Sequence, residues 1–188
     1  MTVRVPSPDS IELPLAERIM LRSGFNFESF PRGCGQVGTA PATQALTGSM
    51  VSARSGEYCN NISVIVTVVG AILTLVKVGL YDLDGTLLGS SIDVHAGSGV
   101  TDFTATGLKV VPLQVPIPIA ADREFYATIL QVGTTPATLL RSFNVAVAGT
   151  LAGIGDGYAQ AVVQTGQADL PAPATFSAAS ILTWFGGS

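Results

Sequence analysis

Two carboxylates spaced two residues apart are the strongest candidates for chemistry in this chain. They are Asp82 and Asp84, in the run from Tyr81 to Leu88 that reads Tyr-Asp-Leu-Asp-Gly-Thr-Leu-Leu. Such a pair could supply a nucleophile and a group that protonates a leaving group. The same residues also suit a tight turn, because Asp-Gly between two apolar runs is a strong signal for a β-hairpin. The two interpretations exclude each other, and the flanking elements decide between them.

The pair resembles the first motif of the haloacid dehalogenase-type phosphatases, a hydrophobic strand that ends in Asp-x-Asp-Gly-Thr. The resemblance implies that Asp82 is the nucleophile and Asp84 the acid/base, with magnesium held by further acids. It also implies a parallel strand followed by a helix. Here strand-like segments follow instead, the later lysine could only be Lys109, and the acid expected soon after Asp156 is absent. The sequence favours a hairpin with Asp84 and Gly85 at its two central positions.

The other reactive side chains are few. The chain has two cysteines, Cys34 and Cys59, and one histidine, His95, which are too few ligands for a zinc site. Two buried thiols are the favoured interpretation, and a disulfide is the alternative. His95 lies in a glycine-rich loop, where a histidine is usually solvated or locally bonded. We expect no catalytic residue, no metal site and no cofactor, with bound calcium at the acidic loops left open.

The segments that must position these residues predict an all-β fold. Short runs rich in Val, Ile and Thr alternate with Gly, Pro, Asp and Asn, and no stretch of helical period is long enough to cover a sheet. This spacing predicts an antiparallel two-sheet sandwich of jelly-roll type. About ten strands are expected, near residues 49–54, 62–69, 72–81, 87–93, 100–104, 109–119, 124–132, 139–147, 157–164 and 175–184.

One predicted strand must lie at the edge of a sheet. Residues 109–119 contain Pro112, Pro116 and Pro118. A proline has no N–H group, and a central strand needs donors along both sides. We therefore expect this strand to border solvent or a partner.

The run from Ile62 to Val76 has no charged residue, which raises the question of a membrane span. A spanning helix needs about 20 apolar residues, and this run is shorter, dense in Val, Ile and Thr, and interrupted by Gly70. Two adjacent buried strands explain it better, so no membrane span is expected.

The composition limits the possible partners. Charged residues make up 12% and hydrophobic residues 47% of the 188 residues, whereas about 25% charged residues is usual. Such a surface is polar through hydroxyl and amide groups and suits burial against neighbours. The nine Lys and Arg residues are scattered, and the net charge is −4. Binding of nucleic acid is therefore not expected.

The amino-terminal part is irregular and is expected to form an assembly arm, residues 1–47, before a sandwich domain at 48–188. Prolines and glycines interrupt it, and a short helix is expected at 14–22. The candidate anchors to another protein are Leu15, Ile19, Phe25, Phe27 and Phe30. Their packing on the chain's own sandwich is the alternative. Residues 1–10 lack the apolar core of a signal peptide, so none is expected.

Three segments of the expected sandwich resemble a β-sandwich domain of tailed-bacteriophage virion proteins, of the minor tail or head-decoration type. They are Val78–Leu88, Leu108–Leu113 and Glu124–Pro136, and the resemblance spans residues 48–185. It implies a non-enzymatic structural component located in the virion, with no shared catalytic residues. Edge strands and low charge suit a symmetric oligomer, and the resemblance to spikes and knobs favours a homotrimer that also contacts capsid or tail proteins.

A receptor- or carbohydrate-binding module of the tail is the alternative function. Loops at one end of the sandwich would then bind a glycan of the host surface, and the polar loop at 93–102 would add hydrogen bonds. The candidate ligand-facing aromatics are Tyr126, Tyr158 and Trp184. Exposure distinguishes the two functions, because rings that stack on a sugar must be open to solvent, whereas buried rings belong to the core.

Overall fold

The computed structural model describes residues 25–30, 35–38, 40–142, 159–179 and 181–188, and the structural statements below concern these residues. The described chain is made of strands with one short 3-10 helix, η2 (Gly99–Thr101). The strands are β1 (Phe27–Glu28), β2 (Gln36–Val37), β3 (Ala45–Ala53), β4 (Tyr58–Val68), β5 (Ala71–Tyr81), β6 (Leu87–Ser90), β7 (Gly107–Pro118), β8 (Arg123–Thr135), β9 (Thr138–Arg141), β10 (Ala161–Gln164), β11 (Ser177–Ala178) and β12 (Gly186–Gly187).

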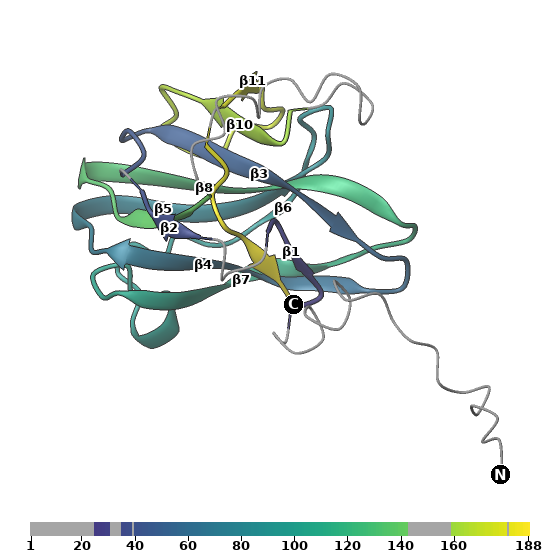
Figure 1. Ribbon diagram of the computed structural model, residues 1–188, viewed down its shortest axis with the longest axis horizontal. Helices are drawn as coiled ribbons and strands as arrows, with labels where there is room; N and C mark the ends of the chain where they lie inside the picture. Colours follow the sequence, from purple (N-terminus) through teal and green to yellow (C-terminus); the bar gives the residue numbers. More distant parts are fainter. Residues whose placement is uncertain (1–24, 31–34, 39, 143–158, 180) are drawn as a thin grey trace, which may run out of the picture.

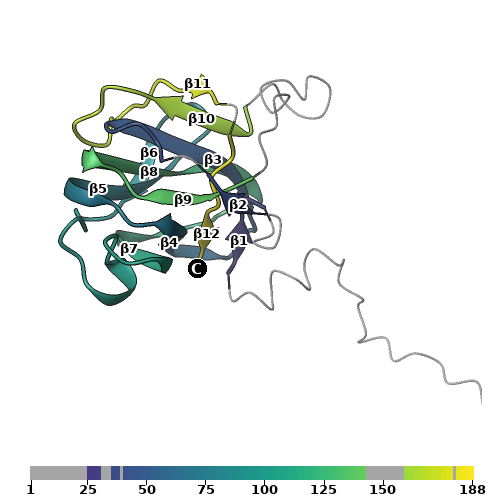
Figure 2. The same ribbon diagram turned by 60° about the vertical axis from the view of Figure 1, so that its left-hand side comes forward.

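The strands form two antiparallel sheets packed face to face, which confirms the predicted all-β, two-sheet sandwich (Figure 1). One sheet has the order β11-β10-β3-β8-β5-β6. The other is centred on β4, which pairs with β7 along one side and with β12 and β9 in succession along the other. β1 and β2 extend this second sheet beyond β12 and β9. Figure 2 shows the two layers from the side.

The core lies between the two sheets because alternate side chains of each strand point inward. Val64 and Val66 of β4 meet Val78 and Leu80 of β5 there, together with Phe125 and Ile129 of β8, and all six are buried. The uncharged run 62–76 thus forms two consecutive strands, as expected, but it is buried only in part, because Val68, Val69 and Ile72 around the turn between the strands are exposed. The two strands are not neighbours in one sheet, however, because β4 and β5 belong to opposite sheets. Both strands alternate toward the same core, so the pattern alone did not reveal the change of sheet.

A second apolar cluster lies on the outer face of the β3-β8-β5 sheet. Residues 165–176 cross this face, and Phe176 packs edge-to-face against Tyr81 and Tyr126, with ring centroids 5.3 Å apart in each pair. The Tyr81 hydroxyl donates to the Pro171 carbonyl at 2.9 Å, and Lys77 pairs with Asp169. β8 is consequently buried on both faces along its middle.

Some predicted strands differ from the structure. Residues 100–104 form the end of η2 and a turn, because the Asp102 carboxylate accepts hydrogen bonds from the Thr104 amide and hydroxyl and so folds the segment back locally. The strand expected at 175–184 is limited to β11. The expected helix at 14–22 lies outside the described residues, as does most of the strand expected at 139–147 beyond the end of β9.

The described part of the expected arm, residues 25–30, 35–38 and 40–47, is built into the sandwich. β1 pairs with β12, and β2 pairs with β9. Phe27 is buried in the main core, and Phe25 packs edge-to-face on Trp184 with ring centroids 5.4 Å apart. Phe25 and Phe27 are therefore not exposed anchors, and the alternative interpretation, packing on the chain's own sandwich, is correct for them. Phe30 is half-buried, and the other two candidate anchors, Leu15 and Ile19, lie outside the described residues.

Candidate functional site

The candidate catalytic motif forms the corner of a β-hairpin. β5 runs into it and β6 leaves it, with Tyr81 paired opposite Leu87. The Asp82 amide donates to the Thr86 carbonyl at 2.8 Å and closes the hairpin. The predicted hairpin is confirmed, and a strand follows Thr86 where the phosphatase family would have a helix.

The turn itself differs from the expectation. The Gly85 amide donates to the Asp82 carbonyl at 3.0 Å, so Leu83 and Asp84 hold the two central positions, not Asp84 and Gly85. Gly85 follows with φ at 89°, in the left-handed region. This is the geometry of a three-residue hairpin loop, in which a turn is followed by a left-handed glycine. An Asp-Gly pair is compatible with the expected two-residue loop and with the observed three-residue loop. In the observed loop, Gly85 also contacts Ala174 of the 165–176 segment.

Both carboxylates of the motif are engaged by the turn. Asp82 forms an ion pair with Arg123 at the start of β8 and accepts from the Leu83 amide at 2.8 Å. Asp84 accepts a hydrogen bond from the Thr86 amide at 2.8 Å, and hydrogen bonding from Thr86 lowers the pKa of the Asp84 carboxyl. The carboxylates thus stabilise a corner between strands, which is the ordinary role of Asp in turns.

We expect Asp82→Asn to change stability slightly and to affect no phosphatase turnover. Its ion pair with Arg123 is partly exposed, so the loss should be no more than about 1 kcal/mol of unfolding free energy. Urea unfolding and hydrolysis of p-nitrophenyl phosphate with magnesium are the measurements. Asp122→Asn, at a carboxylate outside the motif, is the control. Magnesium-dependent turnover that disappears in Asp82→Asn alone would restore the phosphatase interpretation.

Two of the three candidate sugar-binding aromatics are buried. Tyr126 lies beneath Phe176, and its hydroxyl donates to the Ala159 carbonyl at 2.9 Å. Trp184 is fully buried beneath Phe25. Neither ring faces a ligand, which corrects the expectation, because Phe176 packs on Tyr126 and Phe25 packs on Trp184. Tyr158 lies outside the described residues.

The loop that carries His95 is held to β5 by Asp93. One oxygen of the Asp93 carboxylate accepts from the Val76 amide at 2.9 Å and from the His95 amide at 3.0 Å. The other oxygen lies 2.7 Å from Nδ1 of His95. Partial burial disfavours the charged carboxylate, but these hydrogen bonds outweigh it and lower the pKa of Asp93. His95 is therefore a locally bonded loop residue.

Cys59 is a buried free thiol in β4, and Cys34 lies outside the described residues. Burial raises the pKa of Cys59 from 9.0 to about 12. Within the described ranges, no three His, Cys, Asp or Glu side chains come together in a way that could hold a metal ion. None of the described segments is a helix with the length and hydropathy needed to cross a bilayer.

The buried thiol gives a prediction for its reactivity. In a Cys34→Ser background at pH 8, we expect native Cys59 to react with a thiol reagent only as fast as the protein unfolds, because the reactive thiolate is disfavoured. The folded-state pKa lies above the unfolded value, so the contribution of Cys59 to stability is complete below pH 9.0 and is lost as the pH rises toward 12. Absorbance at a series of urea concentrations measures the rate. Fast labelling without urea would contradict the burial.

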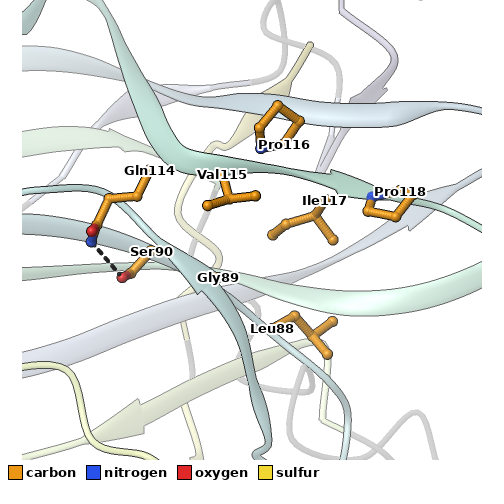
Figure 3. Close-up of a pocket in the computed structure, with 8 residues that line it drawn as sticks. All are labelled: Leu88, Gly89, Ser90, Gln114, Val115, Pro116, Ile117 and Pro118. Carbon is orange, nitrogen blue, oxygen red and sulfur yellow. Dashed lines mark hydrogen bonds between the residues drawn. The ribbon is translucent and has the colours of Figure 1, made fainter.

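An open seam lies between the two sheets, where β6 of one sheet runs beside β7 of the other (Figure 3). Side chains, not a ladder of backbone hydrogen bonds, connect the two strands. Nε2 of Gln114 donates to Oγ of Ser90 at 3.3 Å and to the Ser91 carbonyl at 3.1 Å, and Ile117 packs over Gly89. A groove of about 430 Å³ remains, lined by Leu88, Gly89, Ser90, Gln114, Val115, Pro116, Ile117 and Pro118.

The proline-containing strand β7 is an edge strand, as predicted. In the described part of the chain it pairs with β4 and with no other strand. Its register jumps between Cys59 and Asn61, which lie opposite Ile117 and Pro112, so residues 113–116 leave the ladder as a wide bulge. The bulge directs Val115 into solvent, where 69% of it is exposed.

Comparison with protein-family models, with curated proteins and with solved structures finds no match for this chain.

The groove is a feature that sequence reasoning did not find. The three prolines indicated a free edge, but the strand that lies beside this edge depends on how the two sheets stack. Gly89 was the one available signal, because a side chain there would collide with Ile117.

Proposed function

We propose that the protein is a non-enzymatic structural component of a tailed-phage virion, a minor tail or head-decoration protein. It contacts copies of itself and neighbouring capsid or tail proteins through its sandwich. The resemblance of segments 78–88, 108–113 and 124–136 to virion β-sandwich domains motivates the proposal. The observation that carries it is the open seam, where two sheet edges lie side by side with apolar side chains exposed between them.

The seam favours contacts through side chains. An exposed edge strand normally offers N–H groups to another strand, which risks uncontrolled sheet extension. β7 lacks this donor at Pro112, Pro116 and Pro118, and its bulge twists the edge out of register. A neighbour can therefore pack against Val115 and the proline rings without continuing the sheet, as a subunit of fixed stoichiometry requires.

Asp82 and Asp84 form hydrogen bonds and an ion pair that stabilise their own turn, and this supports the non-enzymatic part of the proposal. An acid that has to attack or protonate a substrate must be free to do so. Asp82 is paired with Arg123, and Asp84 accepts from the Thr86 amide. The low charge of the chain, 12% of its residues, also limits repulsion between copies in a homotrimer or another symmetric oligomer.

Quantitative mass spectrometry of purified phage particles tests the proposal. We expect the chain at a fixed number of copies per particle, and an antibody against it should label one structure of the particle in electron micrographs. A non-structural protein of the same phage serves as the control for material carried over from the lysate. Absence of the chain from particles, at a level no higher than that control, would overturn the proposal.

A further inference from the structure

The two ends of the sandwich differ in charge. At one end, the turns β3–β4, β5–β6 and β7–β8 come together, because the Ser55 amide donates to Asp122 at 2.7 Å and Arg123 pairs with Asp82. This charged end has five acids and two bases, namely Glu57, Asp82, Asp84, Asp122 and Glu124 with Arg54 and Arg123. Figure 1 shows β3 pointing toward it and β4 pointing toward the opposite end.

The opposite end, here called the neutral end, is formed by residues 40–47, 64–75, 99–108 and 128–138. Hydrogen bonds join these segments, from the Gly70 amide to the Phe103 carbonyl at 3.3 Å and from the Gly133 amide to Oγ1 of Thr43 at 3.2 Å. Asp102 is the one charged residue in the four segments, and its carboxylate is bonded to Thr104. Its charge is balanced by Lys109, a buried residue whose ammonium donates to the Thr106 carbonyl at 3.4 Å.

Exposed apolar side chains gather at the neutral end. Nine large hydrophobic side chains are exposed among the described residues, and five of them belong to this end. They are Val68, Val69, Ile72, Val100 and Leu108. Scattered exposed hydrophobics need no explanation, but a concentration without charges is typical of an interaction surface.

The backbone at Ile72 holds the most exposed of these side chains outward. Ile72 has φ at 51°, in the left-handed region that a β-branched residue rarely adopts. Its carbonyl fills the space where Gly133 would have a side chain, so the neighbouring strand fixes the unusual conformation. The side chain of Ile72 is 74% exposed. Strained backbone of this kind is concentrated at functional sites of proteins.

We propose that the neutral end is a self-association surface, and that its partner is the neutral end of a second copy of this chain. The inference deepens the proposed structural role and rests on it. The net charge of −4 opposes contact between copies, and contact through the charged ends would bring carboxylates together. Two neutral ends meet without that cost. Such contact buries β-branched side chains against each other, and its self-complementarity suits a closed symmetric assembly.

Sedimentation equilibrium of the full chain over a concentration series tests the inference. We expect a reversible oligomer that persists in about 1 M salt, where charges are screened beyond about 3 Å. Ile72→Gly should weaken association about tenfold or more, because it removes an isoleucine side chain that the contact between copies would bury. The same variant should unfold no more easily than the wild type, since glycine adopts this φ without strain. If Ile72→Gly associates less but unfolds no more easily, Ile72 contributes to the contact between copies and not to the stability of the fold.

Val100→Ser and Tyr58→Ser compare the two ends of the sandwich. The two residues are 60% and 55% exposed, but Val100 lies at the neutral end, and Tyr58 begins β4 directly after the β3–β4 turn of the charged end. We expect Val100→Ser to weaken association and Tyr58→Ser to leave it unchanged. A wild type that stays monomeric, association unaffected by Ile72→Gly, or association lost in Tyr58→Ser would each overturn the inference. The copy number of the chain in phage particles is measured independently of its association in solution. Failure of the proposed function can therefore be distinguished from failure of this inference.

Discussion

Replacing Phe27 by alanine is expected to lower the free energy of unfolding by about 3–5 kcal/mol. The ring is buried in the main core and stands opposite Gly187 in the pair of β1 with β12. It fills the space that a side chain at Gly187 would need. Because a glycine has no atoms to move into the cavity, the site cannot collapse after the ring is removed. Urea unfolding followed by fluorescence of Trp184, the one tryptophan of the chain, gives the measurement.

Phe30→Ala is the matched control, three residues further along the same segment. Phe30 is half-buried, so its loss should cost about 1 kcal/mol. A large effect at Phe27 and a small one at Phe30 would show that the amino-terminal aromatics differ in role. If Phe27→Ala left stability unchanged, the ring would not belong to the core, and it would return as a candidate anchor for another protein.

The fold class could be predicted because it depends on local patterns. Alternating apolar residues between turn residues indicated the strands, and the prolines of β7 indicated its free edge. The partners of each strand could not be predicted. Phe27 pairs through a strand near the carboxyl end of the chain, and Tyr126 is covered by the segment that carries Phe176. Both contacts join residues far apart in sequence, and a list of aromatic residues does not show which of them meet.

For the candidate site, too, the local element could be predicted from the sequence, but its contacts with other segments could not. The hairpin at Asp82–Gly85 followed from the residues themselves, whereas the length of its loop, with Leu83 and Asp84 at the two central positions, did not. The neutral end could likewise be predicted only in part. The run 62–76 was recognised as uncharged, but its exposure at a turn between two sheets, with Val68 and Ile72 in solvent, required the structure. Local sequence determines elements, and the surfaces formed where elements meet depend on packing.

Gly85→Ala is expected to lower the free energy of unfolding by about 2–3 kcal/mol, with two contributions. Alanine at φ 89° is disfavoured by about 1–2 kcal/mol. In addition, its Cβ would collide with the Ala174 carbonyl and disturb the 2.8 Å hydrogen bond from the Ala174 amide to the Gly85 carbonyl, which contributes about 1 kcal/mol. The comparison with Gly56→Ala separates these contributions, because Gly56 has φ at 86° and no atom within 4 Å of its Cβ position.

Urea unfolding of the two alanine variants decides why the Asp-x-Asp-Gly-Thr run contains its glycine. Gly56→Ala should cost about 1–2 kcal/mol from backbone strain alone, and Gly85→Ala should exceed it by the cost of displacing Ala174. That difference would assign Gly85 to the contact between the hairpin and the 165–176 segment. Equal losses would show that this contact contributes nothing, and the glycine would then be required only by the turn. In both cases the motif has a structural explanation that needs no catalytic role for Asp82 or Asp84.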